Sequence, residues 1–388
     1  MTSSATSSDL RIANRGRVLH TVYSRREISK QGISQALSMS LPTVTQNLKE
    51  IEAMGLIERQ GLYESTGGRK AHIYRFVSCA RIALGVVLLK DFYRVVAVDL
   101  YGNILKSKVV DAPFSRTAGY FKGLGAELER FADEICGKAE RESLACENIS
   151  DRKQILGVAI ALQGLVSNDG SVVVYGQILD CTGLTLNEIQ EHISLPCTLI
   201  HDTEASAIAE MWFQKDKKDA VLLSLNRNFG GALIVDGEVH RGQALSSSVI
   251  EHMGLYPGGR MCYCGKKGCI EAYCSADALQ ESAGEPLEKF FRSMRSGSQE
   301  RVAIWRHYLR DLAMVINNIR MLFDCEYIIG GYLHQFMEEQ DFALLTQYVQ
   351  EECSFPSTDI HLMRSSFTDD SAAPGAGIFL VKQFLGSF

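Results

Sequence analysis

The chain of 388 residues lacks any long uninterrupted run of apolar residues. A membrane-spanning helix needs roughly 18 to 20 such residues, so we expect no membrane partner. The opening stretch MTSSATSSDLRIANRGR also lacks the apolar centre of a secretion signal, and no short repeat or low-complexity tract occurs. We therefore expect a cytoplasmic, globular protein of two or three domains, with 46% apolar residues to fill their cores.

The cysteines do not follow the spacing of a disulfide framework. There are eleven, an odd number, and most of them are scattered along the chain. This distribution favours reduced thiols over disulfide bonds. Only the group from Cys262 to Cys274 is dense enough to indicate a metal site.

Charge is distributed unevenly between the start of the chain and the rest. The first 80 residues contain eleven Lys and Arg against six Asp and Glu, a net charge of +5. The whole chain has 40 basic and 46 acidic residues, so the remainder carries 29 and 40, a net charge of -11. A basic head on an acidic body predicts an anionic partner for the head alone.

The pattern of the head predicts a helix-turn-helix. A helix begins near Asp9, and a short helix around Ile33 is followed by a turn at residues 38–40. Pro42 suits the first turn of the next helix, in which three apolar residues share one face: Val44, Leu48 and Ile51. The opposite face carries polar side chains that can reach base edges in a major groove. The predicted DNA-contacting residues there are Thr43, Thr45, Gln46 and Lys49.

A β-wing is expected after this helix. The segment LIERQGLYESTGGRKAHIYRFV reads as two strands around STGGRK, whose glycines permit a tight turn. Arg69 and Lys70 would then meet phosphate or enter a minor groove. Helices alone are equally compatible with a small bundle that packs on a neighbour. Helices, turn, wing and positive charge together favour DNA binding.

Strands and helices alternate from about residue 81 onward, which predicts α/β sheets. Five features of the chain are informative together: the head ending in STGGRK, HDTEASAIAEMW, GGALIVDGEVHRG, HMG with CYCGKKGCIE, and the late CEYIIGG. In combination they resemble the ROK family of repressors, open reading frames and sugar kinases. The resemblance implies a two-domain, actin-like (ribonuclease H-like) sugar-kinase fold after a winged helix-turn-helix. The expected domains are residues 1–80 (DNA-binding), 81–200 (first α/β), and 201–374 (second α/β, with the metal loop). The C-terminal helix 375–388 is expected to pack back on the first α/β domain.

The resemblance also identifies two phosphate loops in which this chain departs from the kinases. The DxGGTK stretch of the kinases corresponds to residues 87–92, where Val87 replaces the acid and Leu89 and Lys90 replace the glycines. The second loop, GTGIGGG in kinases, begins here with Asn226 and Asn228 in place of glycines. Glycines let backbone N–H groups approach phosphate closely, so their loss predicts that the chain is not an enzyme.

The sugar site implied by the resemblance is partly retained. Its residues would be His201, Asp202, Glu251, His252 and Glu271. Asp202 corresponds to the general base of the kinases, a task that requires a carboxylate near the sugar hydroxyl. Val249 stands where the family carries an acidic ligand, and Glu251 stands where it carries glycine. The cleft is therefore expected to bind some carbohydrate, and a vacant cleft is the alternative.

The cysteine cluster predicts a structural zinc site. His252, Cys262, Cys264 and Cys269 offer one imidazole and three thiolates, the soft ligands that tetrahedral Zn²⁺ prefers. Four protein ligands leave no open position for catalysis. A redox pair or free buried cysteines are the alternatives, and Cys274 is expected to be a bystander.

These observations predict a ROK-type transcriptional regulator, a repressor that binds operator DNA as a homodimer or homotetramer. A carbohydrate or sugar-phosphate effector would shift the closure of the two α/β domains, and operator affinity with it. Two other functions remain open: an active sugar kinase with an added DNA-binding head, and a ligand-independent dimeric DNA-binding protein.

Overall fold

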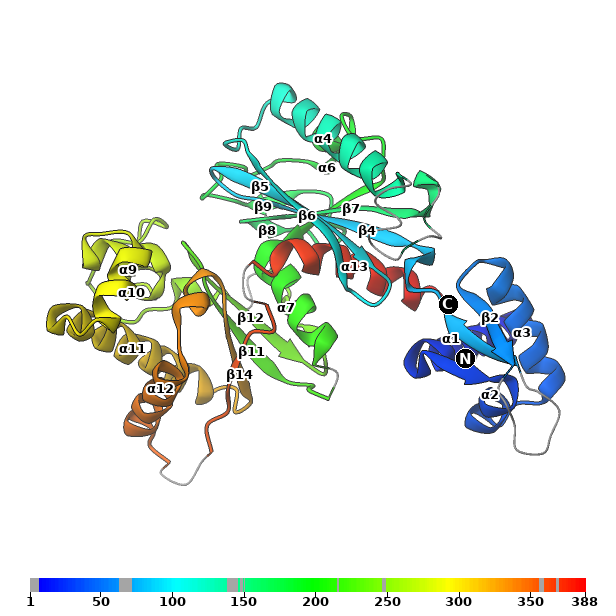
Figure 1. The fold of residues 1–388 in the computed structure, drawn as a ribbon. Coiled ribbons are helices and arrows are strands. Elements are labelled where there is room, and N and C mark those ends of the chain that lie inside the picture. The colour runs from blue at the N-terminus through cyan, green and yellow to red at the C-terminus, as the bar shows by residue number, and fades with distance from the viewer. Residues whose placement is uncertain are drawn as a thin grey trace.

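The structure is a computed structural model. It describes residues 7–62, 72–137, 146, 149, 151–214, 216–245, 249–355, 359–367 and 370–388. An N-terminal head is followed by two α/β lobes, and the C-terminus lies beside the head (Figure 1). None of the helices in these ranges combines the length and the hydropathy that a bilayer crossing requires.

The head consists of three helices and a small sheet. Their bounds are α1 (Ser7–Arg25), β1 (Glu27–Ser29), α2 (Lys30–Leu37), α3 (Leu41–Ala53), β2 (Ile57–Leu62) and β3 (His72–Phe76). The strands pair antiparallel in the order β1-β3-β2. The predicted helix-turn-helix followed by two wing strands is confirmed. The tip of the wing, with Arg69 and Lys70, lies outside the described residues.

Serine residues shape the turn between α2 and α3. Ser38 ends α2 in the left-handed conformation, with φ 51°. Ser40 caps α3, because its hydroxyl oxygen accepts a hydrogen bond from the Thr43 backbone N–H at 3.3 Å. This bond satisfies one of the donors that the first turn of a helix leaves unpaired. Three apolar side chains of α3 are buried in the head: Val44, Leu48 and Ile51.

The first lobe is a five-stranded mixed sheet in the order β10-β7-β4-β5-β6. The strand bounds are β4 (Ile82–Leu88), β5 (Phe92–Asp99), β6 (Ile104–Asp111), β7 (Ile155–Leu162) and β10 (Cys197–His201). Strands β10, β7 and β4 are parallel, and β5 and β6 add antiparallel pairs. A short hairpin, β8 (Leu165–Val166) with β9 (Val173–Tyr175), follows β7. Helices α4 (Ala118–Cys136) and α6 (Leu186–Gln190) cover one face (Figure 1).

Helix α13 (Ala372–Gly386) covers the other face of this sheet. All seven residues of β4 are buried, as expected for a strand that is covered on both faces. Glycines allow the close approach: a Cβ on Gly85 would lie 1.9 Å from the Ala373 carbonyl oxygen, and one on Gly375 would lie 1.8 Å from the Ala205 carbonyl oxygen. The position of α13 is therefore fixed against both β4 and the neighbouring helix α7 (Asp202–Phe213).

The second lobe is another five-stranded sheet, in the order β13-β12-β11-β14-β15. Its strands are β11 (Ala220–Leu225), β12 (Phe229–Val235), β13 (Glu238–Val239), β14 (Glu326–Gly330) and β15 (Leu362–Arg364). The helices beyond it are α8 (Glu271–Cys274), α9 (Ala276–Ala283), α10 (Leu287–Arg295), α11 (Gln299–Arg320) and α12 (Glu339–Glu352). Helix α7 lies between the two sheets (Figure 1).

The head is joined to the first lobe by three aromatic residues. Tyr23 of α1 lies 5.0 Å from Phe76 and 4.8 Å from Tyr101 between ring centroids, and the last two are 5.3 Å apart. Hydrogen bonds reinforce this contact, because Tyr23 donates to the Leu100 carbonyl and Tyr101 donates to the Tyr23 carbonyl, each at 3.2 Å. The C-terminal residue Phe388 adds a second contact, since a Cβ on Gly16 of α1 would lie 2.4 Å from its carbonyl oxygen.

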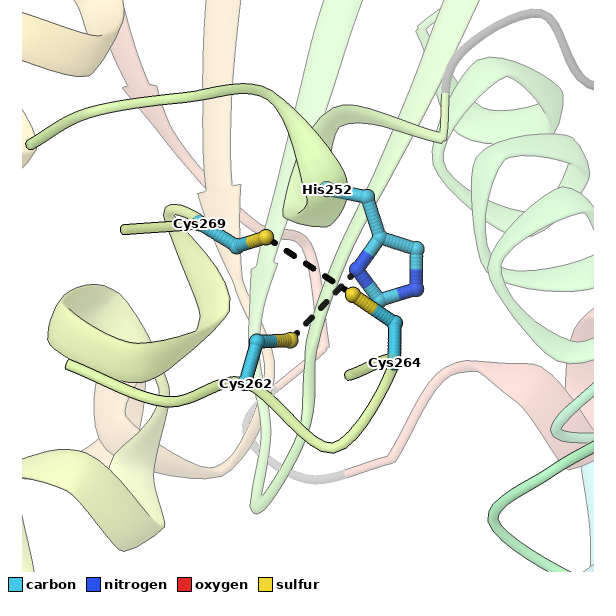
Figure 2. Close-up of side chains that lie close together, drawn as sticks. All are labelled: His252, Cys262, Cys264 and Cys269. Carbon is cyan, nitrogen blue, oxygen red and sulfur yellow. Dashed lines mark hydrogen bonds between the residues drawn. The ribbon is translucent and has the colours of Figure 1, made fainter. Parts of the chain in front are cut away.

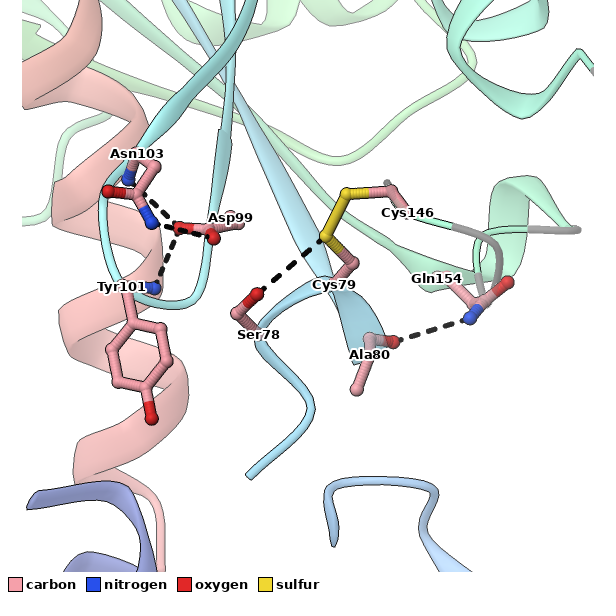
Figure 3. The surroundings of a disulfide bond; sticks show 8 residues. All are labelled: Ser78, Cys79, Ala80, Asp99, Tyr101, Asn103, Cys146 and Gln154. Atoms are coloured by element: carbon pink, nitrogen blue, oxygen red, sulfur yellow. Dashed lines mark hydrogen bonds between the residues drawn. A yellow bond between two sulfur atoms is a disulfide. The ribbon is translucent and has the colours of Figure 1, made fainter. Parts of the chain in front are cut away.

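The expectation that the cysteines are reduced is wrong for one pair. Cys79 and Cys146 form a disulfide, with Cα atoms 5.6 Å apart (Figure 3). Cys79 lies in the short 3₁₀ turn between the head and β4, and Cys146 lies beyond α4 in the sequence. The two are separated by 67 positions, so their proximity depends on tertiary folding and has no local sequence signal. The nine other cysteines form no disulfide.

Candidate functional site

Two adjoining cavities lie between the lobes. The large cavity has a volume of about 1020 Å³, and the small cavity has a volume of about 130 Å³. Side chains from both lobes line them, and Gln163, Asp202, Asn228 and Tyr263 line both. Ligand sites of proteins are typically concave, with a few polar groups that converge on one point. The interface between the lobes is therefore the candidate ligand site.

The turn before β12 is held in place by the side chain of Asn226. Its Oδ1 accepts a hydrogen bond from the Tyr332 backbone N–H at 2.7 Å, and its Nδ2 donates to Ser224 Oγ at 3.0 Å. The Asn226 carbonyl also accepts from the Ala276 N–H at 2.8 Å. An amide thus fills the turn at a position where a glycine would expose its backbone. The Asn226 side chain therefore connects the end of β11 to the segment that follows β14.

An ion pair connects the two lobes at the large cavity. Arg227 Nη1, from the turn before β12, lies 2.8 Å from Asp91 Oδ2, from the turn between β4 and β5. Two basic residues, Lys90 and Arg227, are among the described residues that line this cavity. Six acidic residues line it as well: Asp91, Asp202, Asp277, Glu281, Glu288 and Asp370. The described walls of this cavity therefore carry more acidic than basic groups.

Asp202 lies at the point where β10 passes into α7, and it lines both cavities. Its Oδ1 accepts a hydrogen bond from the Thr203 N–H at 2.8 Å and lies 3.2 Å from His201 Nε2. Burial raises the pKa of Asp202 above its usual range, and His201 opposes this shift. The first turn of α7 also favours a carboxylate here. His201 and Asp202 therefore form one polar edge of the small cavity.

Glu251 and His252 belong to a 3₁₀ turn (Ile250–His252), and both line the small cavity. Burial raises the pKa of Glu251 to about 8, and the charges of Asp202 and Glu271 add to this effect. Ile250 packs against β12, since a Cβ on Gly231 would lie 2.4 Å from its Cδ1. The turn therefore holds the Glu251 side chain against the cavity.

Glu271 occupies a different place from the other predicted sugar ligands. It begins α8, is buried, and accepts hydrogen bonds from Asn228 Nδ2 at 2.9 Å and from the Phe229 N–H at 2.6 Å. Burial raises its pKa to about 7. Glu271 is not among the residues that line either cavity, so its carboxylate orients Asn228, which does line them. The structure thus brings His201, Asp202, Glu251 and His252 together at the small cavity.

The side chains of His252, Cys262, Cys264 and Cys269 converge in a loop between the turn at residues 250–252 and α8 (Figure 2). One ligand atom from each residue lies within 4.8 Å of all the others. His252 Nδ1 is 3.7 Å from Cys262 Sγ, and the Cys264 and Cys269 sulfur atoms are 3.8 Å apart. The loop reverses at Gly268, φ 88°, where a Cβ would lie 1.9 Å from the Tyr256 carbonyl oxygen.

These distances fit a tetrahedral metal ion. Metal–sulfur bonds of about 2.3 Å at tetrahedral angles place two sulfurs about 3.8 Å apart, and a nitrogen and a sulfur about 3.6 Å apart. Burial lowers the pKa of His252, which favours the neutral imidazole that a metal ligand must be. Burial raises the pKa of Cys262 to about 12, so a thiolate there requires a nearby cation. The cluster can therefore hold a metal ion.

Several cavity residues were not identified from the sequence. Gln163 directly follows β7, Gln177 follows the β8–β9 hairpin, and Tyr175 and Tyr263 also line the small cavity. One signal could have indicated Gln163, because ligands of α/β folds bind at the carboxyl ends of parallel strands. Tyr175 ends the short strand β9, and Gln177 and Tyr263 lie in irregular segments, so the position of all three depends on the tertiary fold.

The head presents the predicted DNA-contacting side chains on the outer face of α3. Gln46 and Lys49 are exposed, and Thr43 and Thr45 are half-buried. The Thr45 hydroxyl donates to the Leu41 carbonyl at 2.6 Å, and Gln46 Nε2 donates to Glu50 Oε1 at 2.9 Å. Glu50 also pairs with Arg11 of α1.

Comparison with known proteins gives a consistent family match. A model of the ROK family matches residues 144–383. The xylose repressor of Caldicellulosiruptor bescii is 22% identical over 301 residues, which cover 77% of this chain and 71% of that repressor. The chain matches 71% of the length of this repressor and 63% of the length of the next two relatives.

Solved structures share the fold. A crystal structure described as a ROK family transcriptional regulator, a homolog of the E. coli MLC protein, has a TM-score of 0.76 and 24% identity, and the match covers 97% of each chain. The ROK hexokinase of Thermus thermophilus has a TM-score of 0.60 and 19% identity, and the match covers 78% of this chain and 99% of the hexokinase. The predicted fold class, a winged helix-turn-helix followed by a body with the sugar-kinase fold, is confirmed by these likenesses.

Proposed function

Because this chain belongs to the ROK family, whose model matches residues 144–383, we propose that it is a DNA-binding transcriptional regulator, a repressor whose body binds a carbohydrate or sugar phosphate. The observation that carries this proposal is the head. Its α3 buries one face in the head and leaves Gln46 and Lys49 exposed on the other, next to two wing strands. A recognition helix of a winged helix-turn-helix requires this arrangement.

The body supports carbohydrate binding without phosphoryl transfer. Asp202, His201 and Gln163 supply donors and acceptors that suit sugar hydroxyls. The side chain of Asn226 fills the turn before β12, and the Asp91–Arg227 pair spans the large cavity. Its walls carry more acidic than basic groups. These features support a binding function in which Asp202 is a ligand contact and not a general base.

We propose that the His252, Cys262, Cys264 and Cys269 cluster holds a structural zinc ion. Three sulfur ligands and one nitrogen ligand are the set that Zn²⁺ prefers, and four protein ligands leave it no position for water. The ion would fix the loop and, through His252, the turn that carries Glu251. The metal would therefore stabilise one wall of the small cavity.

The contacts between the head and the body provide a route by which ligand binding would change the DNA affinity of the head. Tyr23, Phe76 and Tyr101 attach the head to the first lobe, and Phe388 of the C-terminal segment contacts α1 at Gly16. A ligand that favours one separation of the lobes would change the position of the heads in a homodimer or homotetramer. Operator affinity depends on the spacing of paired recognition helices. We propose this as the route of regulation.

Selection of DNA by the purified chain tests the proposed function. Duplexes with a random central region are enriched on the full-length protein, and the selected sequence is titrated at several salt concentrations. The proposal expects dissociation constants of about 10⁻⁸ M or tighter, with a strong decrease in affinity as salt rises. Failure to enrich any sequence, together with ADP release from ATP and a hexose, would instead assign the chain to the kinases.

A further inference from the structure

The small cavity contains the Glu251 carboxylate, which accepts a hydrogen bond from its own backbone N–H. No hydrogen bond or ion pair joins the Glu251 side chain to any other described residue. Its neighbours add further negative charge, because Asp202 lines the same cavity and Glu271 lies close behind it. No Lys or Arg is among the described residues that line the small cavity. A carboxylate that faces other carboxylates, with neither Lys nor Arg among the described residues beside it, would be stabilised by a bound cation.

The backbone of Glu251 is held by contacts of the residues on both sides. Ile250 before it packs on β12, where a Cβ on Gly231 would clash with its side chain. His252 after it belongs to the cluster with Cys262, Cys264 and Cys269. The backbone at Glu251 therefore needs little rearrangement when the carboxylate pairs with a ligand.

The other lining residues suit a carbohydrate that bears this cation. Gln163, Gln177 and Asn228 offer amide donors and acceptors for hydroxyl groups. Tyr175 and Tyr263 line the same cavity, and the face of a tyrosine ring attracts a cation as well as apolar C–H groups. A phosphate group, in contrast, would meet Asp202 and Glu251, and no Lys or Arg among the described lining residues would neutralise it.

We propose that the small cavity selects a carbohydrate with a protonated amine, an unacetylated amino sugar, and that Glu251 pairs with its ammonium group. This inference rests on the proposed carbohydrate-binding function and narrows it, because it excludes the sugar phosphates and neutral sugars that the general proposal allows. The charge-assisted hydrogen bond between ammonium and carboxylate accounts for the preference.

Calorimetric titration of the full chain tests this inference. The probes are glucosamine, galactosamine and mannosamine, each compared with its neutral parent hexose, its N-acetyl derivative and its 6-phosphate. We expect at least one amino sugar to bind about tenfold or more tightly than its three counterparts. Glu251→Gln, which keeps the shape but removes the charge, should abolish this preference.

Two controls separate specificity from folding. Glu281→Gln removes an exposed carboxylate from the wall of the large cavity and should change the affinity less than twofold. Glu251→Gly removes the side chain and should bind the amino sugar no better than the neutral hexose. The unchanged melting temperature and metal content of each variant would verify its fold.

The outcomes distinguish this inference from the proposed function. Equal or tighter binding of neutral, N-acetylated or phosphorylated sugars would overturn the amine preference and leave carbohydrate sensing intact. A preference for the amino sugar over its neutral counterpart that survives in Glu251→Gln would also overturn it. If none of the probes binds, the inference and the carbohydrate-sensing part of the proposed function both fail, while DNA binding is measured separately.

Discussion

At the scale of single residues, the best-defined site is the cluster of His252 with three cysteines. Its four ligand atoms lie within 4.8 Å of one another, although the loop that carries them contains little regular structure. Backbone hydrogen bonds also hold this loop, such as Cys262 N–H to the Lys266 carbonyl at 2.8 Å. A bound metal ion would join its segments through their side chains and add to the local stability.

Removal of one ligand should remove the metal. The wild-type chain is expected to contain about one zinc per molecule, and Cys264→Ser should contain almost none, because a three-ligand site binds far more weakly. Elemental analysis of the purified proteins measures both. Cys325→Ser changes a half-buried thiol outside the cluster and should keep its metal. If the wild-type protein without metal melts at the same temperature as the metal-bound protein, the structural role of the metal is contradicted.

At the scale of elements, two helices connect the sequence to function. Helix α3 presents Gln46 and Lys49 to solvent, and α13 packs against β4 and α7 through glycines. The first arrangement follows from a 3.6-residue period and could be predicted from the sequence. The second depends on residues far apart in the chain, such as Gly85 and Gly375, and carries no periodic signal.

Substitutions on α3 should weaken DNA binding. Gln46→Ala is expected to cost about 1–3 kcal/mol against the selected sequence, since a lost base contact typically has this effect. Lys49→Ala should weaken binding to all sequences and lower its dependence on salt. Fluorescence anisotropy measures both. Lys122→Ala removes the same charge at an exposed position of α4 and is the control. This variant should bind DNA as the wild type does. Unchanged DNA affinity in both α3 variants would show that α3 is not the helix that contacts the DNA bases.

A methyl group at Gly375 should destabilise the first lobe. The new Cβ would lie 1.8 Å from the Ala205 carbonyl oxygen, so α13 and α7 would have to separate. The expected cost is about 1–3 kcal/mol, measured by denaturant unfolding. Gly386→Ala in the same helix is the control, because nothing lies within 4 Å of its Cβ. This control should be neutral or slightly stabilising, and equal losses in both variants would contradict the packing argument.

The disulfide between Cys79 and Cys146 gives a prediction at the same scale. It closes a loop of 67 positions, so its loss is expected to lower the free energy of unfolding by about 2–4 kcal/mol. A phosphine reductant should lower the unfolding midpoint of the wild type and leave the unfolding midpoint of Cys79→Ser unchanged. Alkylation of the denatured chain should label nine cysteines before reduction and eleven after it. Eleven labels without reductant would show that the bond is absent.

At the scale of the whole molecule, the order of head and body could be predicted from the sequence, and much of the site could not. The wing strands, the α/β alternation and the four-residue cluster were all visible as local patterns. The Cys79–Cys146 pair, the position of Glu271 behind Asn228, and the Asp91–Arg227 contact were not. Each of these joins segments that are distant in sequence, so only the packing of the lobes brings them together.

The central claim is that a carbohydrate in the cleft changes the affinity of the head for DNA. The most direct measurement is the dissociation constant for the selected DNA with and without a saturating carbohydrate that stabilises the protein in a thermal-shift panel. We predict at least a fivefold change in the wild type and none in Asp202→Asn, which should still bind DNA alone. An identical constant at saturating carbohydrate would contradict the account.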